Sequence, residues 1–366
     1  MISRDIIAAN LKNCLSDTSF LSLPHCRKGK VRDTFDLGDK LLLVTTDRQS
    51  AFDRILAEVP FKGQVLNQVS AFWFDNTRDI VANHVIDIPD PNVTVGKKCT
   101  VFPVEFVVRG YLTGSTDTAA WTLYSKGQRT ICGNILPDGM KKNQKFDTPI
   151  LTPTTKSEHH DEPMSVDEIV SSGLIARETM ERLTGIVMRL FERGTKIAAE
   201  NGLILVDTKY EFGADKDGNI VLIDEIHTPD SSRFWLADSY AQRFAEGREP
   251  ENIDKEFLRL WFREHCDPYK DKVLPPAPDE LVIELSSRYI RLYEMITGKE
   301  FSIDVSMPIE KRLKKNLAAY LPVAAPAKRK ARAAAGPKKA MPANRKRRLN
   351  AASKHMRNKK PKRTKK

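Results

Sequence analysis

The chain has no cysteine pattern typical of a zinc site or a disulfide framework, and it has no long apolar run. Its five cysteines are scattered, odd in number and without a CxxC pair, which fits a reducing compartment. Charges at Arg4, Asp5 and Lys12 interrupt the N-terminal segment, so it is neither a signal peptide nor a membrane span. We therefore expect a soluble cytoplasmic protein with no membrane partner.

The common nucleotide-binding motifs are also missing. The sequence contains neither GxxxxGK[ST] nor GxGxxG, and it lacks the HRD and DFG motifs of protein kinases. These absences argue against a P-loop and against a protein kinase. Any phosphate-binding segment must therefore be built in another way.

Acidic residues are absent from residues 323–366, the C-terminal tail. The tail holds 18 of the 60 Lys and Arg residues and none of the 48 Asp and Glu residues, which leaves 42 basic and 48 acidic residues in the rest of the chain. The formal net charge of +12 therefore describes the tail and not the mildly acidic body. A segment rich in Ala, Pro, Lys and Arg cannot build a core, so we expect the tail to be disordered.

The stretch around which the chain is organised is a predicted strand at 203–212, followed by a second strand and a polar turn. Asp207, Lys209 and Glu211 occupy alternate positions of the first strand and therefore share one face. The sequence PDSSR at 229–233 adds a carboxylate, hydroxyls and a guanidinium just beyond the second strand. This region is our candidate reaction centre.

The register of this hairpin decides whether it can bind a metal. Asp217-Gly218 is typical of a two-residue hairpin turn, and such a turn would place Glu211 opposite Asp224. Two facing carboxylates need a positive charge between them, and a divalent cation bound by oxygens is the usual one. A shift of one residue would put Asp224 on the other face, and a solvated hairpin is then the alternative.

Residues 25–47 are predicted to form two strands around a turn at 36–39. Lys28, Lys30 and Arg32 would share one face of the first strand, and Gly29 would let the backbone approach a polyphosphate closely. An exposed edge strand guarded by lysines is the alternative interpretation.

Two further polar segments follow apolar strands. The sequence DRQSAFD at 47–53 places carboxylates, a hydroxyl and an arginine at a strand end, where binding groups are often found; a capped turn is the alternative. Arg109 opens RGYLTGS at 109–115, where two glycines and hydroxyls could cradle an anion.

The remaining chain is predicted to be a long polar loop and a set of helices. Residues 133–163 are rich in turn formers, and we favour a polar loop over a metal-ligand cluster for His159-His160-Asp161-Glu162. Helices are predicted over 165–200, with a capping box at its start, near 252–265 and over 279–297.

Six of these segments, in this order, resemble the SAICAR synthetase family. They are GKVRD (29–33), DRQSAFD (47–53), VVRGYLTGS (107–115), TPTTK (152–156), DTKYEFG (207–213) and DEIHTPDSSRFW (224–235). Each motif is modest by itself, but six in order over roughly residues 25–305 are specific. The tail has no counterpart in the shared core, so the resemblance says nothing about it.

The resemblance implies an α+β fold with a small β-rich, ATP-binding lobe over a larger α/β lobe. By this expectation, residues 1–108 form the first lobe, residues 109–310 form the second, and 323–366 is the tail. The family's members join the carboxylate of carboxyaminoimidazole ribotide (CAIR) to the amino group of L-aspartate and release ADP and phosphate.

The resemblance also implies roles for individual residues. Those expected at the ATP phosphates are Gly29, Lys30 and Arg32, and those expected at Mg²⁺ are Glu211 and Asp224. Those expected at CAIR or L-aspartate are Ser50, Asp53, Arg109, Ser115, Asp230, Ser232 and Arg233, with Asp207 and Lys209 beside them as catalytic groups.

The chemistry of such a ligase explains these residue types. A carboxylate is a poor electrophile, so ATP must activate it, and an acyl phosphate is the expected intermediate. Phosphoryl transfer needs alignment and charge neutralisation, which Mg²⁺, Lys30 and Lys209 can supply. The attacking amine must also lose a proton, and Asp207 is one candidate to accept it.

Two other functional hypotheses remain at this point. A small-molecule kinase on a similar frame would also use ATP, but its product would carry phosphate and no succinyl group. The tail could bind polyanions without sequence preference or direct the protein to the nucleus, and a solvated extension without function is the alternative. Because the tail has no aromatic residue, base stacking is not expected.

Overall fold

The computed structural model describes residues 2–24, 26–116, 118–156, 162–253 and 255–321. The predictions for His159, His160 and Asp161 and for the tail lie outside these residues. The described residues belong to one compact unit, and the division into two lobes stays a prediction. Each helix of this part of the chain is too short or too polar to cross a lipid bilayer.

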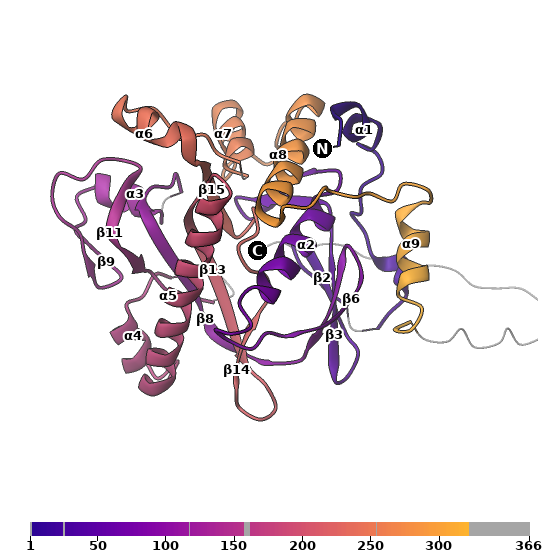
Figure 1. Cartoon of the computed structure of the whole chain (residues 1–366), viewed down its shortest axis with the longest axis horizontal. Helices are drawn as coiled ribbons and strands as arrows, with labels where there is room; N and C mark the ends of the chain where they lie inside the picture. The colour runs from indigo at the N-terminus through magenta and orange to yellow at the C-terminus, as the bar shows by residue number, and fades with distance from the viewer. Residues whose placement is uncertain (1, 25, 117, 157–161, 254, 322–366) are drawn as a thin grey trace, which may run out of the picture. The chain divides into compact units, whose positions relative to one another are not determined.

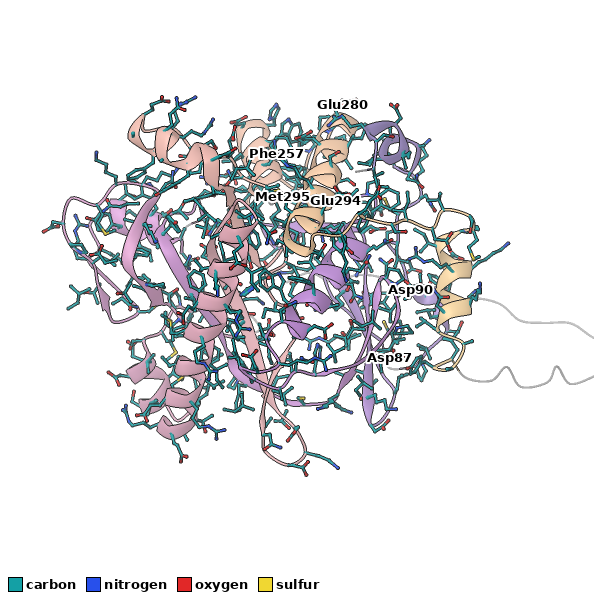
Figure 2. All side chains as sticks on the ribbon, viewed as in Figure 1. Asp87, Asp90, Phe257, Glu280, Glu294 and Met295 are labelled. Atoms are coloured by element: carbon teal, nitrogen blue, oxygen red, sulfur yellow. The ribbon has the colours of Figure 1, made fainter. Side chains whose placement is uncertain are left out.

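The first sheet is antiparallel and has the strand order β1-β2-β3-β7-β6. Its strands are β1 (Cys26–Lys28), β2 (Arg32–Asp36), β3 (Lys40–Thr45), β6 (Val85–Asp90) and β7 (Val93–Lys97). Alternate residues of β2, β3 and β7 face a small apolar core that also receives Leu313 from helix α9 (Ile309–Asn316) and Leu317 just after it. The carboxylate of Asp90 accepts hydrogen bonds from Arg312 of α9 at 3.1 and 3.2 Å, which fixes that helix against the sheet (Figure 2).

A tight turn separates β1 from β2, so the prediction that Lys28, Lys30 and Arg32 share one strand face is wrong. Lys28 pairs with Asp33 across the hairpin, and the amide of Gly29 donates to the carbonyl of Arg32 at 2.9 Å. A Cβ at position 29 would lie 2.4 Å from that carbonyl oxygen. The turn itself therefore requires glycine, and it leaves Lys30 at the tip.

The motif at 47–53 stabilises this turn through Arg48. Arg48 donates to the carbonyl oxygens of Gly29 and Lys30 at 3.0 and 3.2 Å, and it forms a buried ion pair with Asp33 at 2.6 Å. Asp47 is buried and accepts backbone N–H groups from two other segments. Asp47 and Arg48 thus have structural roles in the fold.

The second sheet is built around two long strands, β8 (Thr100–Leu112) and β13 (Leu203–Ala214). Its order is β11-β8-β13-β14, with β12 paired to β8 and β15 paired to β13, and every pairing is antiparallel. The other strands are β11 (Gln144–Leu151), β12 (Thr154–Thr155), β14 (Ile220–Ile223) and β15 (Ser232–Leu236). The lobe boundary expected after residue 108 falls inside β8.

The register of the β13–β14 hairpin differs from the prediction by one residue. Glu211 pairs with Ile223 and not with Asp224. The reason is a longer loop, in which the side chain of Asp215 accepts the amides of Asp217 and Asn219 at 3.0 and 2.9 Å. Strand β14 therefore starts one residue later than a two-residue turn would place it. Asp224 lies just after the end of β14 and has a φ of 68°.

Helices cover the second sheet and join the two sheets. The described helices are α1 (Arg4–Ala9), α2 (Lys62–Asp75), α3 (Ala120–Ser125), α4 (Val166–Ser171), α5 (Arg177–Glu200), α6 (Ala237–Ala245), α7 (Glu256–His265), α8 (Asp279–Thr297), α9 and a 3-10 turn at Ser19–Leu21. The remaining strand pairs are β4 (Arg48–Ala51) with β5 (Arg54–Glu58), and β9 (Thr130–Ile131) with β10 (Asn134–Ile135). Helix α5 packs along β13, and α8 packs on α2 (Figure 1).

The predicted helices agree with these elements except at one point. The capping box at Ser165 and Glu168 is confirmed, but it starts α4, which ends at Ser171, before α5 begins at Arg177. The long α5 buries one apolar face against the sheet, including Leu183, Val187 and Leu190. The helices predicted near 252–265 and over 279–297 are confirmed as α7 and α8.

Candidate active site

A cavity of about 240 Å³ opens where β8, β13, β15 and α7 meet. Six residues expected from the sequence line it: Arg109, Asp207, Lys209, Asp230, Ser232 and Arg233. They come from three adjacent strands and the turn before β15. Because these strands are neighbours in one sheet, residues far apart in the sequence lie around one space.

Asp207 is the centre of the sheet side of the cavity. The strand register places it opposite Arg109 of β8 and Arg233 of β15. Its Oδ2 forms an ion pair with Arg233 and lies 3.5 Å from Nη1 of Arg109. Burial lowers the pKa of Arg109, Asp207 opposes this effect and Arg233 adds to it. The single carboxylate of Asp207 neutralises only part of the charge of the two guanidinium groups. The remaining positive charge can bind an anionic substrate.

Helix α7 supplies the opposite wall, which the sequence did not predict. Glu256 accepts a hydrogen bond from Ser115 and forms an ion pair with Arg259 at 3.3 Å. Burial acts to raise the pKa of Glu256, but Arg233 and Arg259 outweigh it, and the pKa is lowered. In the sequence these charged residues look like the solvated face of an amphipathic helix, so no local signal could identify them.

A buried ion pair fixes Asp230 at the edge of the cavity. Its Oδ2 accepts from Lys62 of α2 at 2.8 Å, and its Oδ1 accepts from the hydroxyl of Tyr289 of α8 at 2.6 Å. Burial favours the neutral acid, but Lys62, Lys255 and Tyr289 outweigh it and hold the pKa of Asp230 below its usual range. No sequence pattern indicates Lys62, whose side chain is fully buried.

Ser232, beside Asp230 in the sequence, turns toward the sheet. Its hydroxyl donates to Oγ1 of Thr208 at 2.8 Å, and both residues line the cavity. The turn that carries the motif PDSSR is therefore tied to β13 by a side-chain hydrogen bond.

A second charged cluster lies farther along the same face of β13. Lys209 forms ion pairs with Glu211 and, at 2.9 Å, with Glu105, which is the cross-strand partner of Glu211. Burial would lower the pKa of Lys209, but Glu211, Asp224 and Glu105 outweigh it and raise this pKa well above its ordinary value. Lys209 is therefore a fixed positive charge.

Two more cations complete this cluster. Lys156, from the motif TPTTK, forms an ion pair with Glu211, and Arg32 forms one with Asp224 and lies 3.7 Å from Glu225. Glu211 and Asp224 thus share one charged cluster, although they are not cross-strand partners. The motif at 152–156 had already indicated the segment that carries Lys156.

The carboxylates of this cluster fit a metal that is held jointly with phosphate. Among the described residues, no group of three or more His, Cys, Asp or Glu side chains is arranged to hold an ion by itself. Magnesium, however, is commonly bound through one or two carboxylates together with the phosphates of a substrate. Glu211 and Asp224 fit that second type of site.

Among the expected residues, Lys30, Ser50 and Asp53 belong neither to the cavity lining nor to the ion pairs of the second charged cluster. Lys30 and Asp53 form an exposed ion pair between two turns, and Ser50 lies on β4. Phe52 and Asp53 both have positive φ, at 53° and 58°, as the tight turn between β4 and β5 requires. The structure does not bring Ser50 and Asp53 to the lining of the cavity described above.

Comparisons with known proteins identify the family of the chain. Residues 25–276 match the family model of SAICAR synthetase. The chain is 60% identical over 309 residues to a phosphoribosylaminoimidazole-succinocarboxamide synthase of Legionella pneumophila. The aligned residues cover 84% of this chain and 99% of that relative.

Solved structures give the same result for the fold. A SAICAR synthase from Saccharomyces cerevisiae, complexed with SAICAR, is 34% identical with a TM-score of 0.67, covering 77% of this chain and 97% of the other. A SAICAR synthetase in complex with ADP is 25% identical with a TM-score of 0.59, covering 76% of this chain and all of the other. The chain therefore belongs to the SAICAR synthetase family, the ATP-dependent ligases that join CAIR to L-aspartate in purine biosynthesis.

Proposed function

We propose that this ligase activates the carboxylate of CAIR as an acyl phosphate, which the amine of L-aspartate then attacks. The observation that carries the proposal is the shared face of β13. Asp207, in the anion-binding cavity, and Glu211, in the second charged cluster, are separated only by Lys209 on that face. A phosphoryl group and a substrate carboxylate bound to these two clusters would meet at Lys209.

We assign the nucleotide to the second charged cluster. Gly29, Lys30 and Arg32 would contact the phosphates of ATP, and Glu211 and Asp224 would hold Mg²⁺. The ion supplies neutralisation of the charge that develops on the transferred phosphoryl group. Lys156 and Lys209 add positive charge beside it, so they stabilise the same developing charge.

We assign the two organic substrates to the cavity and the turns around it. Arg109 and Arg233 suit the carboxylates and the ribotide phosphate because a guanidinium grips such groups through two parallel hydrogen bonds. Ser115, Ser232 and Asp230 would orient the same substrates. Ser50 of β4 and Asp53 of the β4–β5 turn would join them, although both lie outside the cavity lining.

The acyl phosphate is tested by following oxygen. With ¹⁸O in the carboxylate of CAIR, we expect one labelled oxygen in the phosphate released for each SAICAR formed, because amine attack breaks the carbonyl carbon–oxygen bond. Phosphate should form only when CAIR, L-aspartate, ATP and Mg²⁺ are all present. The second labelled oxygen stays in SAICAR as the amide carbonyl. Unlabelled CAIR in ¹⁸O water is the control, and released phosphate without label from the carboxylate would contradict the acyl phosphate. Steady turnover without aspartate, giving a phosphorylated product, would favour the small-molecule kinase.

A second proposal concerns the tail, whose positive charge separates it from the acidic body. We propose that residues 323–366 bind polyanions through charge alone, with nuclear targeting as a further use of the same basic runs. The catalytic reaction would take place in the cytoplasm, where the five free cysteines remain reduced.

Deleting residues 323–366 is expected to leave the turnover of the ligase unchanged within about 2-fold, because the family match ends at residue 276. Retention on a DNA column at low salt should be lost, because the basic residues that would neutralise DNA phosphates are removed. In the full chain, log K should fall against log salt with a slope of about −0.9 for each phosphate neutralised. The matched control has a tail of equal length in which all Lys and Arg residues are Gln. Retention that survives both changes would contradict the proposal.

A further inference from the structure

Lys255 lines the cavity but takes no part in its ion pairs. It is the residue immediately before α7, beside Glu256. In the part of the chain that the structure describes, its ammonium group has no hydrogen bond or ion pair with another side chain. Asp230, the carboxylate that most favours its charged form, already accepts hydrogen bonds from Lys62 and Tyr289 through its two oxygens.

The surroundings of Lys255 disfavour its positive charge. Burial is the main cause, and it lowers the pKa of Lys255 to about 8, with Arg259 and Lys62 adding to the effect and Asp230 and Glu225 opposing it. The N-terminal end of α7 also disfavours a cation. The other charged groups around the cavity are Arg109, Asp207, Lys209 and Arg233 on the sheet side and Glu256 on α7.

The other titratable groups of the cavity are poorly suited to accept a proton. Lys209 is held in its protonated form by three carboxylates. Asp230 and Glu256 have lowered pKa values, because neighbouring cations outweigh their burial. Asp207, which the sequence indicated as a candidate base, is held between Arg109 and Arg233 and positions both of them.

We infer that Lys255 is the general base that accepts a proton from the ammonium group of L-aspartate. The neutral Nζ takes that proton, and the amine lone pair forms the bond to the acyl carbon. The bond from that carbon to the phosphate oxygen breaks, and phosphate leaves with its electron pair and with the second proton of the attacking nitrogen, so that a neutral amide remains. Lys255 then returns its proton to water. The inference rests on the ligase reaction proposed above.

Two variants and one pH series test this role. Lys255→Arg keeps the positive charge but cannot lose it near neutral pH, whereas Lys255→Gln removes the charge. For the wild type we expect kcat/KM for aspartate to rise with pH through a value near 8, because the neutral amine is the active form. In Lys255→Arg we expect kcat to fall about 100-fold, a loss typical of removing a general base, with little change in KM and without that rise.

A second acceptor separates the base from a structural role. Hydroxylamine is neutral near pH 7 and needs no base to become a nucleophile, so it should trap an acyl phosphate equally well in wild type and Lys255→Arg. Lys270→Arg is the matched control, since that lysine is exposed on a distant turn. Thermal unfolding of each variant shows whether the fold is kept.

Each other result has a defined meaning. A normal kcat in Lys255→Arg, with KM for aspartate raised in Lys255→Gln, would mean that Lys255 only binds a carboxylate and would overturn the inference. Loss of hydroxamate in Lys255→Arg but not in wild type would overturn it as well. If wild type forms no hydroxamate but Lys255→Arg loses the rise of kcat/KM with pH, the acyl phosphate proposal is wrong and the assignment of Lys255 as the base is supported.

Discussion

Replacing Glu211 with Gln is expected to lower turnover by about 10²–10³-fold, the range seen when one group that stabilises developing charge is removed. The amide keeps the shape of the side chain and can still accept a hydrogen bond from Lys156 or Lys209. It cannot bind Mg²⁺ as a carboxylate does, and it leaves two lysines beside a neutral group. We therefore expect a higher Mg²⁺ concentration for half-maximal rate as well as a lower kcat.

The fold should survive this substitution, because Lys209 retains Glu105 at 2.9 Å. The measurement is the steady-state rate against Mg²⁺ concentration, with thermal unfolding of the same sample. Glu181→Gln on the exposed face of α5 is the matched control, and its rate should equal that of wild type. An unchanged Mg²⁺ dependence in Glu211→Gln would remove Glu211 from the metal site.

The sequence predicts the groups on β13 because strand geometry fixes them. Side chains alternate along any strand, so Asp207, Lys209 and Glu211 had to share a face wherever the strand lay. The register of the next strand depended instead on one side chain, Asp215, whose hydrogen bonds to two amides lengthen the loop. A dipeptide such as Asp-Gly predicts a turn, but it does not show that a neighbouring carboxylate will enlarge it.

The site residues that the sequence does not predict, such as Lys62 and Glu256, reach the site through contacts between segments that are far apart in the chain. Lys62 and Asp230 are 168 positions apart, and Glu256 meets Ser115 over 141 positions. Lys62 and Glu256 would each be interpreted locally as a solvated charge on a helix. Only the packing of α2 and α7 against the sheet shows which of them face the cavity.

The two sheets contribute differently to the site for a physical reason. In the second sheet, neighbouring strands place Arg109, Asp207 and Arg233 in one row, so the strand pairings position these groups. In the first sheet, Lys30 stands on a turn, and the buried Arg48 supports that turn through two carbonyl oxygens. The first sheet therefore positions Lys30 through a turn, whereas the second sheet positions its charged groups through strand pairing.

The pair formed by Lys62 and Asp230 joins this row to the helices. Lys62 begins α2, Asp230 precedes β15, and Tyr289 on α8 shares the same carboxylate. The side chains of Lys62 and Asp230 are 0% and 4% exposed. Replacing both charges together removes the pair, whereas removing one charge leaves the other buried without a counterion. That difference decides how the pair should be tested.

We expect Lys62→Met to lower the free energy of unfolding by about 3–5 kcal/mol, because it leaves the buried carboxylate of Asp230 without its counterion. Chemical unfolding at pH 7 without substrates measures this change. The double variant Lys62→Met with Asp230→Asn is the control, and it should regain a large part of the loss because no lone charge stays buried. It should still be inactive, since Asp230 lines the substrate cavity. If Lys62→Met loses less than about 1 kcal/mol, the range of an exposed ion pair, then the pair does not hold α2 to the site.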